Sequence, residues 1–406
     1  MYVSVNCHNI ITAISEHYFE VKGQKTKEII GVTKDQLGNK LEQKKKPINE
    51  LKVAAVCNWH DTCGISTYTK FLIDSIRPLV KEIKIFSEIN PKPTHKDSAE
   101  VVRTWKRGQS MHETIKQLLA WQPDFVIIQH EFGIFPKATY FLQMLHMLED
   151  TAYIVTLHSV YEHLDKIVCT SAIKNIVVHS EQAKKCLEDL GHSSKIFVIP
   201  HGCLELEDNK ELWNIFQTPH VIIQFGFGFF YKGVDRALDA VSYLKEKYKD
   251  IFYVYLCSDT GNFNNVHSEY YRFLLDKINQ LNLHDNVAII RRFQSDQVLN
   301  SYLRTAKVAI FPYVTNPKHR VFGASGAIRV SMANKIPVIA SESHQFDDVD
   351  GVLPRPHDHI SLAEEIDKVF SDSEHRKDLL GKINKYIKDN SWEITAKRYL
   401  ESYYKV

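Results

Sequence analysis

Short apolar runs alternate with amphipathic stretches along the chain from residue 51 onward. The first run, KVAAVC at 52–57, is apolar at almost every position, which is typical of a strand buried on both faces of a parallel sheet. The stretch after the next loop, 65–79, repeats its apolar residues with helical spacing instead. This alternation predicts an α/β protein whose sheets are covered by helices on both faces.

The alternation occurs twice, which indicates two doubly wound, Rossmann-like domains with parallel sheets. The first series has predicted strands at 52–57, 83–86, 125–129, 153–157, 175–178 and 196–199, and helices at 65–79, 111–121, 138–148 and 181–190. The second has strands at 221–225, 252–258, 287–291, 308–311 and 337–340, and helices at 234–247, 268–280, 295–305, 327–334, 360–370 and 374–388. Such sheets bind ligands at the carboxyl ends of their strands, so we expect the domains to face a central cleft.

Changes in composition set the expected domain boundaries. We expect an N-terminal extension at 1–50 with a small hairpin and a basic loop (Lys44, Lys45, Lys46), an N-terminal domain at 51–203, a polar linker at 204–219, a C-terminal domain at 220–388, and a final amphipathic helix within 389–406. The final helix is expected to pack back toward the N-terminal domain.

Composition narrows the cellular setting. The chain has 406 residues, of which 44% are hydrophobic and 25% charged, as in soluble globular proteins. Its net charge of +2 gives no global field for nucleic acid or an anionic membrane. The seven cysteines form no C-x-x-C pair, which favours free thiols and no metal site. Without a signal peptide or a run of about 20 apolar residues, we expect a cytoplasmic protein whose membrane contact, if any, is peripheral, at the inner face.

Glycines and small residues mark a candidate anion site in the segment 318–341, which reads as loop, helix and strand. Gly323, Ser325 and Gly326 lie together just before the predicted helix. Small residues there let backbone N–H groups approach an anion, and the helix N-terminus adds roughly half a positive charge. The segment therefore suits a phosphate or diphosphate, although an ordinary turn into a helix would look similar.

Two further loops stand at strand-to-helix turns. FGFGFFYKG at 225–233 places Lys232 just before a helix, and a lysine aimed at the same point as a helix N-terminus suits a diphosphate leaving group. WHDTCGISTYT at 59–69 places Gly64 at a helix start. Because neither loop reads G-x-G-x-x-G, the dinucleotide-binding fingerprint is absent.

Taken in order, these motifs resemble those of GT-B glycosyltransferases, closest to the family-4 type that uses sugar nucleotides, over residues 51–404. The segments that carry the resemblance are CGISTY at 63–68, QHEFGIF at 129–135, TLHS at 156–159, VVHSE at 177–181, VIPHG at 198–202, FGFGFFYKG at 225–233 and SGAIRVSMANKIPVIAS at 325–341. The resemblance implies a nucleotide diphosphate sugar donor held by the C-terminal domain, an acceptor held by the N-terminal domain, and neither cofactor nor metal.

The resemblance also assigns roles to individual positions. Lys232 matches the family's diphosphate lysine, and His158 matches the cleft histidine that touches the donor sugar. Gly64 matches the glycine over which the donor approaches. The backbone amides that bind the diphosphate fall at Ser325, Gly326 and Ala327.

Two departures from the family pattern concern charge. The arginine expected six residues before the lysine aligns with Gly226 or Phe227, and the Glu-x7-Glu pair aligns with Phe322 and Val330. Basic residues beside the diphosphate loop could replace the missing positive charge; they are Lys318, His319, Arg320 and Arg329. Of these, we assign Arg320 to donor binding. The missing glutamates leave the stereochemical outcome open.

The acceptor side has three candidates. His130 and Glu131 follow a predicted strand, and a histidine with a pKa near 6.5 can accept a hydroxyl proton. Asp61, in the loop before Gly64, could orient an acceptor hydroxyl. Structural hydrogen bonding is the competing interpretation for each of them, and the one favoured for His179 and His201.

The leading hypothesis is therefore a retaining, metal-independent hexosyltransferase of carbohydrate biosynthesis that acts on a carbohydrate, lipid-linked or other hydroxyl acceptor. Three alternatives stay open: a sugar-nucleotide epimerase or hydrolase, a non-catalytic nucleotide-sugar-binding partner subunit, and a transferase that modifies DNA bases. The last would need a basic stripe with aromatic residues along the N-terminal cleft.

Overall fold

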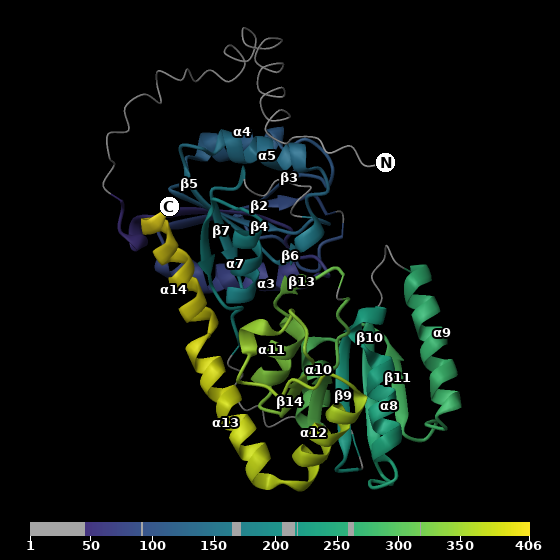
Figure 1. Ribbon diagram of the computed structural model, residues 1–406. Helices are drawn as coiled ribbons and strands as arrows, with labels where there is room; N and C mark the ends of the chain where they lie inside the picture. The colour runs from purple at the N-terminus through teal and green to yellow at the C-terminus, as the bar shows by residue number, and fades with distance from the viewer. Residues whose placement is uncertain are drawn as a thin grey trace.

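The computed structural model describes residues 45–90, 92–164, 172–204, 216, 218–258, 264–316 and 318–406. The hairpin expected within residues 1–50 lies outside the described residues, as does most of the expected linker. Figure 1 shows the rest of the chain as two lobes, one above the other.

The N-terminal lobe is built on a seven-stranded parallel sheet in the order β3-β2-β1-β4-β5-β7-β8. Its strands are β1 (Lys52–Cys57), β2 (Glu82–Glu88), β3 (Val101–Trp105), β4 (Phe125–His130), β5 (Ala152–Leu157), β7 (Asn175–Val178) and β8 (Lys195–Val198). Its helices are α3 (Gly64–Ile76), α4 (His112–Trp121), α5 (Ala138–Met147) and α7 (Glu181–Asp189), with short 3-10 turns at Ile48–Glu50 and Arg77–Leu79. Strands β1 and β4 are buried along almost their whole length, because helices cover both faces of the sheet.

The C-terminal lobe has a five-stranded parallel sheet in the order β11-β10-β9-β12-β14. Its strands are β9 (Val221–Phe227), β10 (Phe252–Ser258), β11 (Val287–Arg291), β12 (Val308–Phe311) and β14 (Val338–Ala340). Its helices are α8 (Val234–Leu244), α9 (Asn264–Gln280), α10 (Asp296–Thr305), α11 (Gly326–Ala333), α12 (His359–Ser371) and α13 (Ser373–Asp389), with 3-10 turns η5 (Phe230–Lys232) and η6 (Asp347–Val349). None of the described helices combines the length and apolar character that a membrane crossing requires.

Helix α14 (Trp392–Ser402) carries the chain back to the N-terminal lobe, where it packs against α3 and is followed by the turn η7 (Tyr403–Lys405). Figure 1 shows α13 and α14 along one side of the molecule, spanning both lobes. Where they meet, Cys203 N–H donates to the Asn390 carbonyl (2.8 Å) and Trp392 N–H donates to the Cys203 carbonyl (3.2 Å). Gly202 is required beside this crossing because a Cβ there would lie 2.5 Å from the Trp392 ring.

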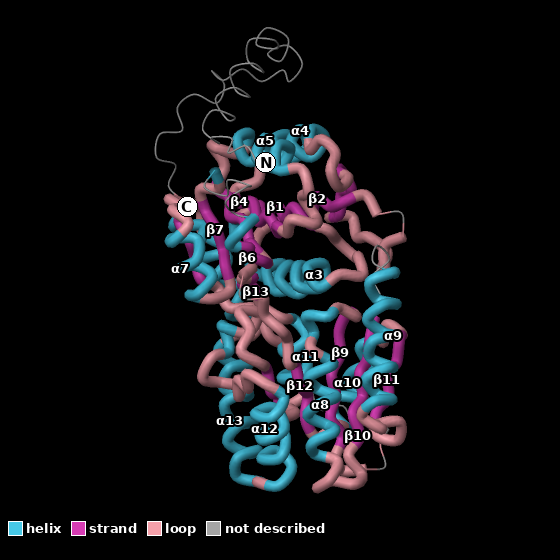
Figure 2. The backbone as a smooth tube through the Cα atoms, turned by 45° about the vertical axis from the view of Figure 1, so that its right-hand side comes forward, coloured by secondary structure: helices cyan, strands magenta, loops and turns pink. Residues whose placement is uncertain are grey.

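A small antiparallel sheet joins the lobes directly. Strand β6 (Ser159–Tyr161) of the N-terminal lobe pairs with β13 (Val321–Gly323), which leads into α11. The Phe322 side chain is 3% exposed and belongs to the hydrophobic core of the N-terminal lobe. Figure 2 shows α3 between the N-terminal sheet and the C-terminal lobe. The lobes also meet where α7 packs against β13 and η6 (Asp347–Val349).

The architecture confirms the predicted fold class of two parallel-sheet α/β domains. Strands β3, β6 and β13 were not among the predicted elements, and α9 begins at Asn264, earlier than the predicted 268. Strands β6 and β13 are three residues long and pair only with each other, so no local pattern identifies them.

Candidate functional site

Lys232 lies at the end of η5, where the chain turns sharply into α8. The turn depends on Gly233, whose φ of 63° is in the left-handed region. A Cβ at this position would lie 1.9 Å from the Pro312 carbonyl oxygen, so only glycine fits against the residue that follows β12. This packing fixes the direction in which Lys232 leaves the turn.

The ammonium group of Lys232 rests on Tyr313. Its Nζ donates to the Tyr313 hydroxyl (2.6 Å) and lies 3.9 Å from the centre of that ring. Burial lowers the pKa of Lys232. Tyr313 in turn contacts Ser325, with 3.4 Å between their hydroxyl oxygens. Tyr313 therefore brings the lysine and the start of α11 to one place.

The loop before α11 is held by a buried arginine. Arg329, 2% exposed, donates to the Ser325 carbonyl (3.1 Å) and to the Tyr386 hydroxyl (3.2 Å), and it forms an ion pair with Asp348. The Ser325 N–H donates to the Gln345 carbonyl. Arg329 therefore positions the loop. The first N–H groups of α11, those of Gly326 and Ala327, have no partner within the helix and are available to bind an anion.

His158 follows β5 and lies beside the same loop. Its ring Nε2 is 2.7 Å from the Gln129 Oε1 at the end of β4. The His158 backbone approaches Gly323 closely, because β6 and β13 pair immediately after His158. A Cβ at Gly323 would lie 3.0 Å from the His158 carbonyl oxygen. Burial, helped by the neighbouring His179 and His130, holds the pKa of His158 well below its usual range.

His201 completes this arrangement, although its sequence context favours a structural role. Its Nδ1 donates to the Gly202 carbonyl (2.7 Å), so Nε2 carries the lone pair. That Nε2 lies 3.7 Å from the place of a Cβ at Gly326. The ring also packs edge-on against Tyr68, as the His158 ring does. Two neutral histidines thus pack against Tyr68, and one of them, His201, lies beside the start of α11.

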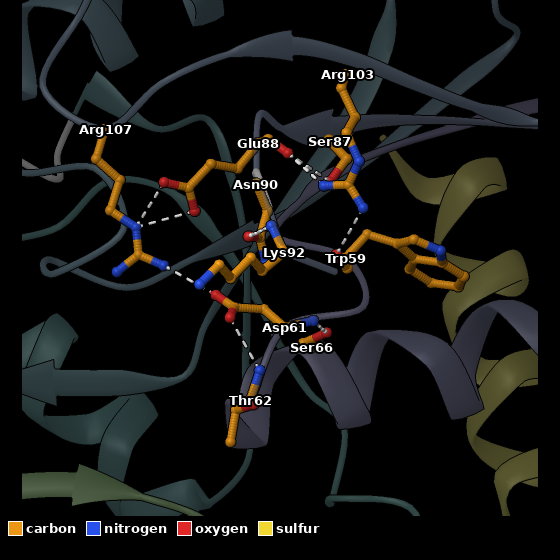
Figure 3. A network of polar contacts seen from close by, with 10 residues as sticks. All are labelled: Trp59, Asp61, Thr62, Ser66, Ser87, Glu88, Asn90, Lys92, Arg103 and Arg107. Atoms are coloured by element: carbon orange, nitrogen blue, oxygen red, sulfur yellow. Dashed lines mark hydrogen bonds and ion pairs between the residues drawn. The ribbon is translucent and has the colours of Figure 1, made fainter. Parts of the chain in front are cut away.

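The Gly64 loop has open space where it meets α3. A Cβ at Gly64 would meet no atom within 4 Å. Next to it, Asp61 accepts from Thr62 N–H (2.9 Å) and lies 3.4 Å from the Arg107 guanidinium, whose Nε also donates to both carboxylate oxygens of Glu88. Figure 3 shows this network between the loop and the ends of β2 and β3. Asp61 is therefore oriented by a cation, and its carboxylate remains about one-third exposed.

His130 and Glu131 are occupied by their own lobe. The His130 ring, 2% exposed, stacks on Phe135 (5.6 Å) and contacts Phe141 (4.7 Å), and burial lowers its pKa to about 3. The Glu131 carboxylate accepts from Phe132 N–H (3.1 Å), and burial raises its pKa. These surroundings favour packing over proton handling for His130.

Arg320 is engaged across the two lobes. Its guanidinium donates to both oxygens of Glu162 (3.2 and 3.0 Å), and the Glu162 N–H donates to the Arg320 carbonyl. The arginine side chain is 48% exposed. The geometry places Arg320 beside β6 and β13 as a bridge between the lobes.

We expect Arg320→Ala to change the KM for a nucleotide sugar less than about fivefold, because the guanidinium is already engaged by Glu162 and an exposed ion pair contributes only about 0 to 1 kcal/mol. Donor titrations of the wild type, Arg320→Ala and Glu162→Gln test this. Loss of donor affinity in Arg320→Ala with no loss in Glu162→Gln would return Arg320 to the donor site.

Two residues of the site, Tyr313 and Gln129, escaped sequence reasoning. Tyr313 follows β12 after a proline, and Gln129 reads as the last residue of a strand. Both residues are buried and carry a polar group at the carboxyl end of a strand. Their place at a strand end was the only feature of the sequence that could have pointed to the site.

Comparison with known proteins concerns the family and the fold. Residues 206–385 match the family model described as glycosyl transferases group 1. A search of curated protein sequences finds no match.

The whole fold resembles solved glycosyltransferases. A glycosyltransferase from Rickettsia africae has a TM-score of 0.70 at 16% identity, covering 88% of this chain and 98% of that one. Sucrose-phosphate synthase from Thermosynechococcus elongatus has a TM-score of 0.66 at 16% identity, covering 87% and 98%. HepE from Anabaena in complex with UDP-glucose has a TM-score of 0.65 at 12% identity, covering 88% and 100%. The likeness establishes the GT-B architecture over most of the chain.

Proposed function

We propose that this chain, whose C-terminal domain matches the glycosyl transferases group 1 family within a GT-B fold, moves a hexose from a nucleotide diphosphate sugar to an acceptor hydroxyl. The structures of similar fold solved with UDP or UDP-sugars favour a uridine nucleotide as the donor. The proposed outcome is retention at the anomeric carbon, without a metal ion.

One observation carries the proposal. Lys232 is half-buried, and no carboxylate among the described residues pairs with its ammonium, which rests on the neutral hydroxyl of Tyr313. A partly desolvated charge without an opposite charge is costly, so it is retained where a ligand supplies the counter-charge. The contact from Tyr313 to Ser325 places that charge beside the N-terminus of α11, and together they suit a diphosphate.

The proposed chemistry follows from this placement. As the bond from the sugar to the diphosphate breaks, negative charge grows on the leaving oxygen. Lys232 and the N–H groups of Gly326 and Ala327 would stabilise that charge, and a preorganised donor of this kind is typically worth a few kcal/mol. His158 would contact the sugar from the opposite lobe, and Gly64 would let the donor lie over the start of α3.

Nucleotide binding gives the first test. We expect UDP at about 100 times its dissociation constant to stabilise the protein by about 2.7 kcal/mol, read as a rise in Tm. UDP, GDP, ADP and dTDP should be compared, each with and without EDTA, because a site built on Lys232 should bind equally well without a divalent ion. If none of the four raises Tm, the proposed function is wrong; an EDTA-sensitive shift would reject only metal independence.

Turnover separates transfer from the alternatives. Release of UDP from UDP-sugars that depends on an added hydroxyl acceptor supports the transferase, whereas equal release without an acceptor indicates a hydrolase. Binding with no turnover over a broad acceptor panel would indicate a non-catalytic subunit.

A further inference from the structure

Gln129 and His158 form a hydrogen-bonded pair at the ends of two neighbouring strands. Gln129 is fully buried in β4, and His158 follows β5 directly. The Gln129 Oε1 lies 2.7 Å from the His158 Nε2. An amide oxygen only accepts hydrogen bonds, so the ring nitrogen facing it must carry the proton. The other ring nitrogen, Nδ1, then carries the lone pair.

The ring is held in this orientation by its neighbours. Tyr68 of α3 packs edge-on against it, with centroids 4.8 Å apart at 84°, and His179 lies 5.6 Å away. The titratable groups around it are His130, His179, His201 and Tyr68. Burial lowers the pKa values of the three histidines and raises that of Tyr68, so all four groups are neutral near pH 7.

Gln129 has a donor that is not used within the described part of the chain. Its Nε2 is buried and has no hydrogen-bond partner there. A buried polar atom left unpaired is costly, so a glutamine serving only to fill space would be a poor choice at this position. The Gln129 Oε1 accepts the His158 hydrogen bond, and this contact explains why an amide stands at this position.

We propose that Gln129 is a positioning residue that fixes His158 as the Nε2–H tautomer and leaves Nδ1 as a hydrogen-bond acceptor for the transferred sugar. The contact with the sugar rests on the proposed function, whereas the fixed tautomer rests on the pair alone. A consequence is that the sugar must offer a hydroxyl as a donor to Nδ1. A donor analogue with hydrogen or a methyl ether at that hydroxyl should lose the contact.

The tautomer is tested by NMR of the full chain with 15N-labelled histidine, which distinguishes a protonated from an unprotonated ring nitrogen. The His158 signals are identified by their loss in His158→Phe. We expect Nε2 protonated and Nδ1 unprotonated from pH 7 down to about 5.5 in the wild type. Gln129→Leu should give a mixture of tautomers. Gln129→Glu places a carboxylate against Nε2–H and should raise the pKa of His158.

The buried pair of Thr104 and Thr114 offers a matched control. Thr104→Val removes a buried polar group from the same lobe without touching His158, so it should leave the His158 signals unchanged. The proposal is overturned if wild-type His158 is protonated at Nδ1, if it titrates near pH 6.5, or if Gln129→Leu and Gln129→Glu leave its signals as they are.

Kinetics then connect the tautomer to the reaction. Loss of one neutral hydrogen bond predicts that Gln129→Leu lowers kcat about threefold to tenfold. Because the nucleotide is expected on the C-terminal lobe, UDP affinity should be unchanged. Gln129→Glu should add an acidic limb to the rate profile as pH falls through the raised pKa of His158. Should the NMR pattern hold while no nucleotide sugar is turned over, the proposed function fails and the fixed tautomer stands.

Discussion

Lys232→Ala is expected to lower the transfer rate at least about a hundredfold, because one preorganised charge at a leaving group is worth roughly 2.7 kcal/mol or more. The loss should appear in kcat as well as in UDP affinity, since the diphosphate gains charge as its bond to the sugar breaks. Tyr313→Phe, which removes the hydroxyl holding Nζ at 2.6 Å, should have a smaller effect in the same direction. Steady-state kinetics with a UDP-sugar and calorimetric titration of UDP measure both.

Lys247→Ala is the matched control for this experiment. Lys247 lies after α8, is 57% exposed and pairs with Asp367. The variant therefore lacks a lysine that belongs to the same lobe but is distant from the site. Its rate should stay near that of the wild type. Turnover of Lys232→Ala within a few fold of the wild type would remove the lysine from the reaction.

Acid is expected to destabilise the folded protein through four buried histidines. Burial lowers the pKa values of His130, His158, His179 and His201, so these rings are neutral when folded and become protonated when unfolded below pH 6.5. The unfolded state therefore binds more protons, and stability falls as pH decreases from about 6.5 toward the folded pKa values. A ring that stays neutral in the folded state costs about 1.2 kcal/mol as the pH falls from 7 to 5.5, so the four rings together cost at most about 5 kcal/mol.

His130→Phe isolates one of these contributions. The ring already packs between Phe135 and Phe141, so an aromatic replacement keeps the contact area and removes the titration. The free energy of unfolding should fall by about 1.2 kcal/mol less between pH 7 and pH 5.5 in the variant than in the wild type, measured by denaturant unfolding at both pH values. Equal unfolding free energies at both pH values in the wild type would contradict the assignment of neutral buried rings.

The sequence by itself determined the architecture. Buried apolar runs such as KVAAVC at 52–57 can only be satisfied between two layers of helices, and their alternation with amphipathic stretches leaves a doubly wound parallel sheet as the outcome. Local chemistry also made Lys232 and the start of α11 candidates for anion binding, because small residues before a helix leave its first N–H groups accessible. These features depend on neighbours in the chain and can be read without the fold.

The tertiary structure alone decided how these parts act together. The contact of Lys232 with Tyr313 joins residues 81 positions apart, and the pairing of β6 with β13 joins the two lobes through strands too short to have a pattern of their own. Gln129 and His158 meet because β4 and β5 are adjacent in the sheet, and Arg329 holds the anion loop because Asp348 and Tyr386 come to it from later elements. Side-chain hydrogen bonds and charges act over a few ångströms, so their partners are set by packing and not by spacing in the sequence.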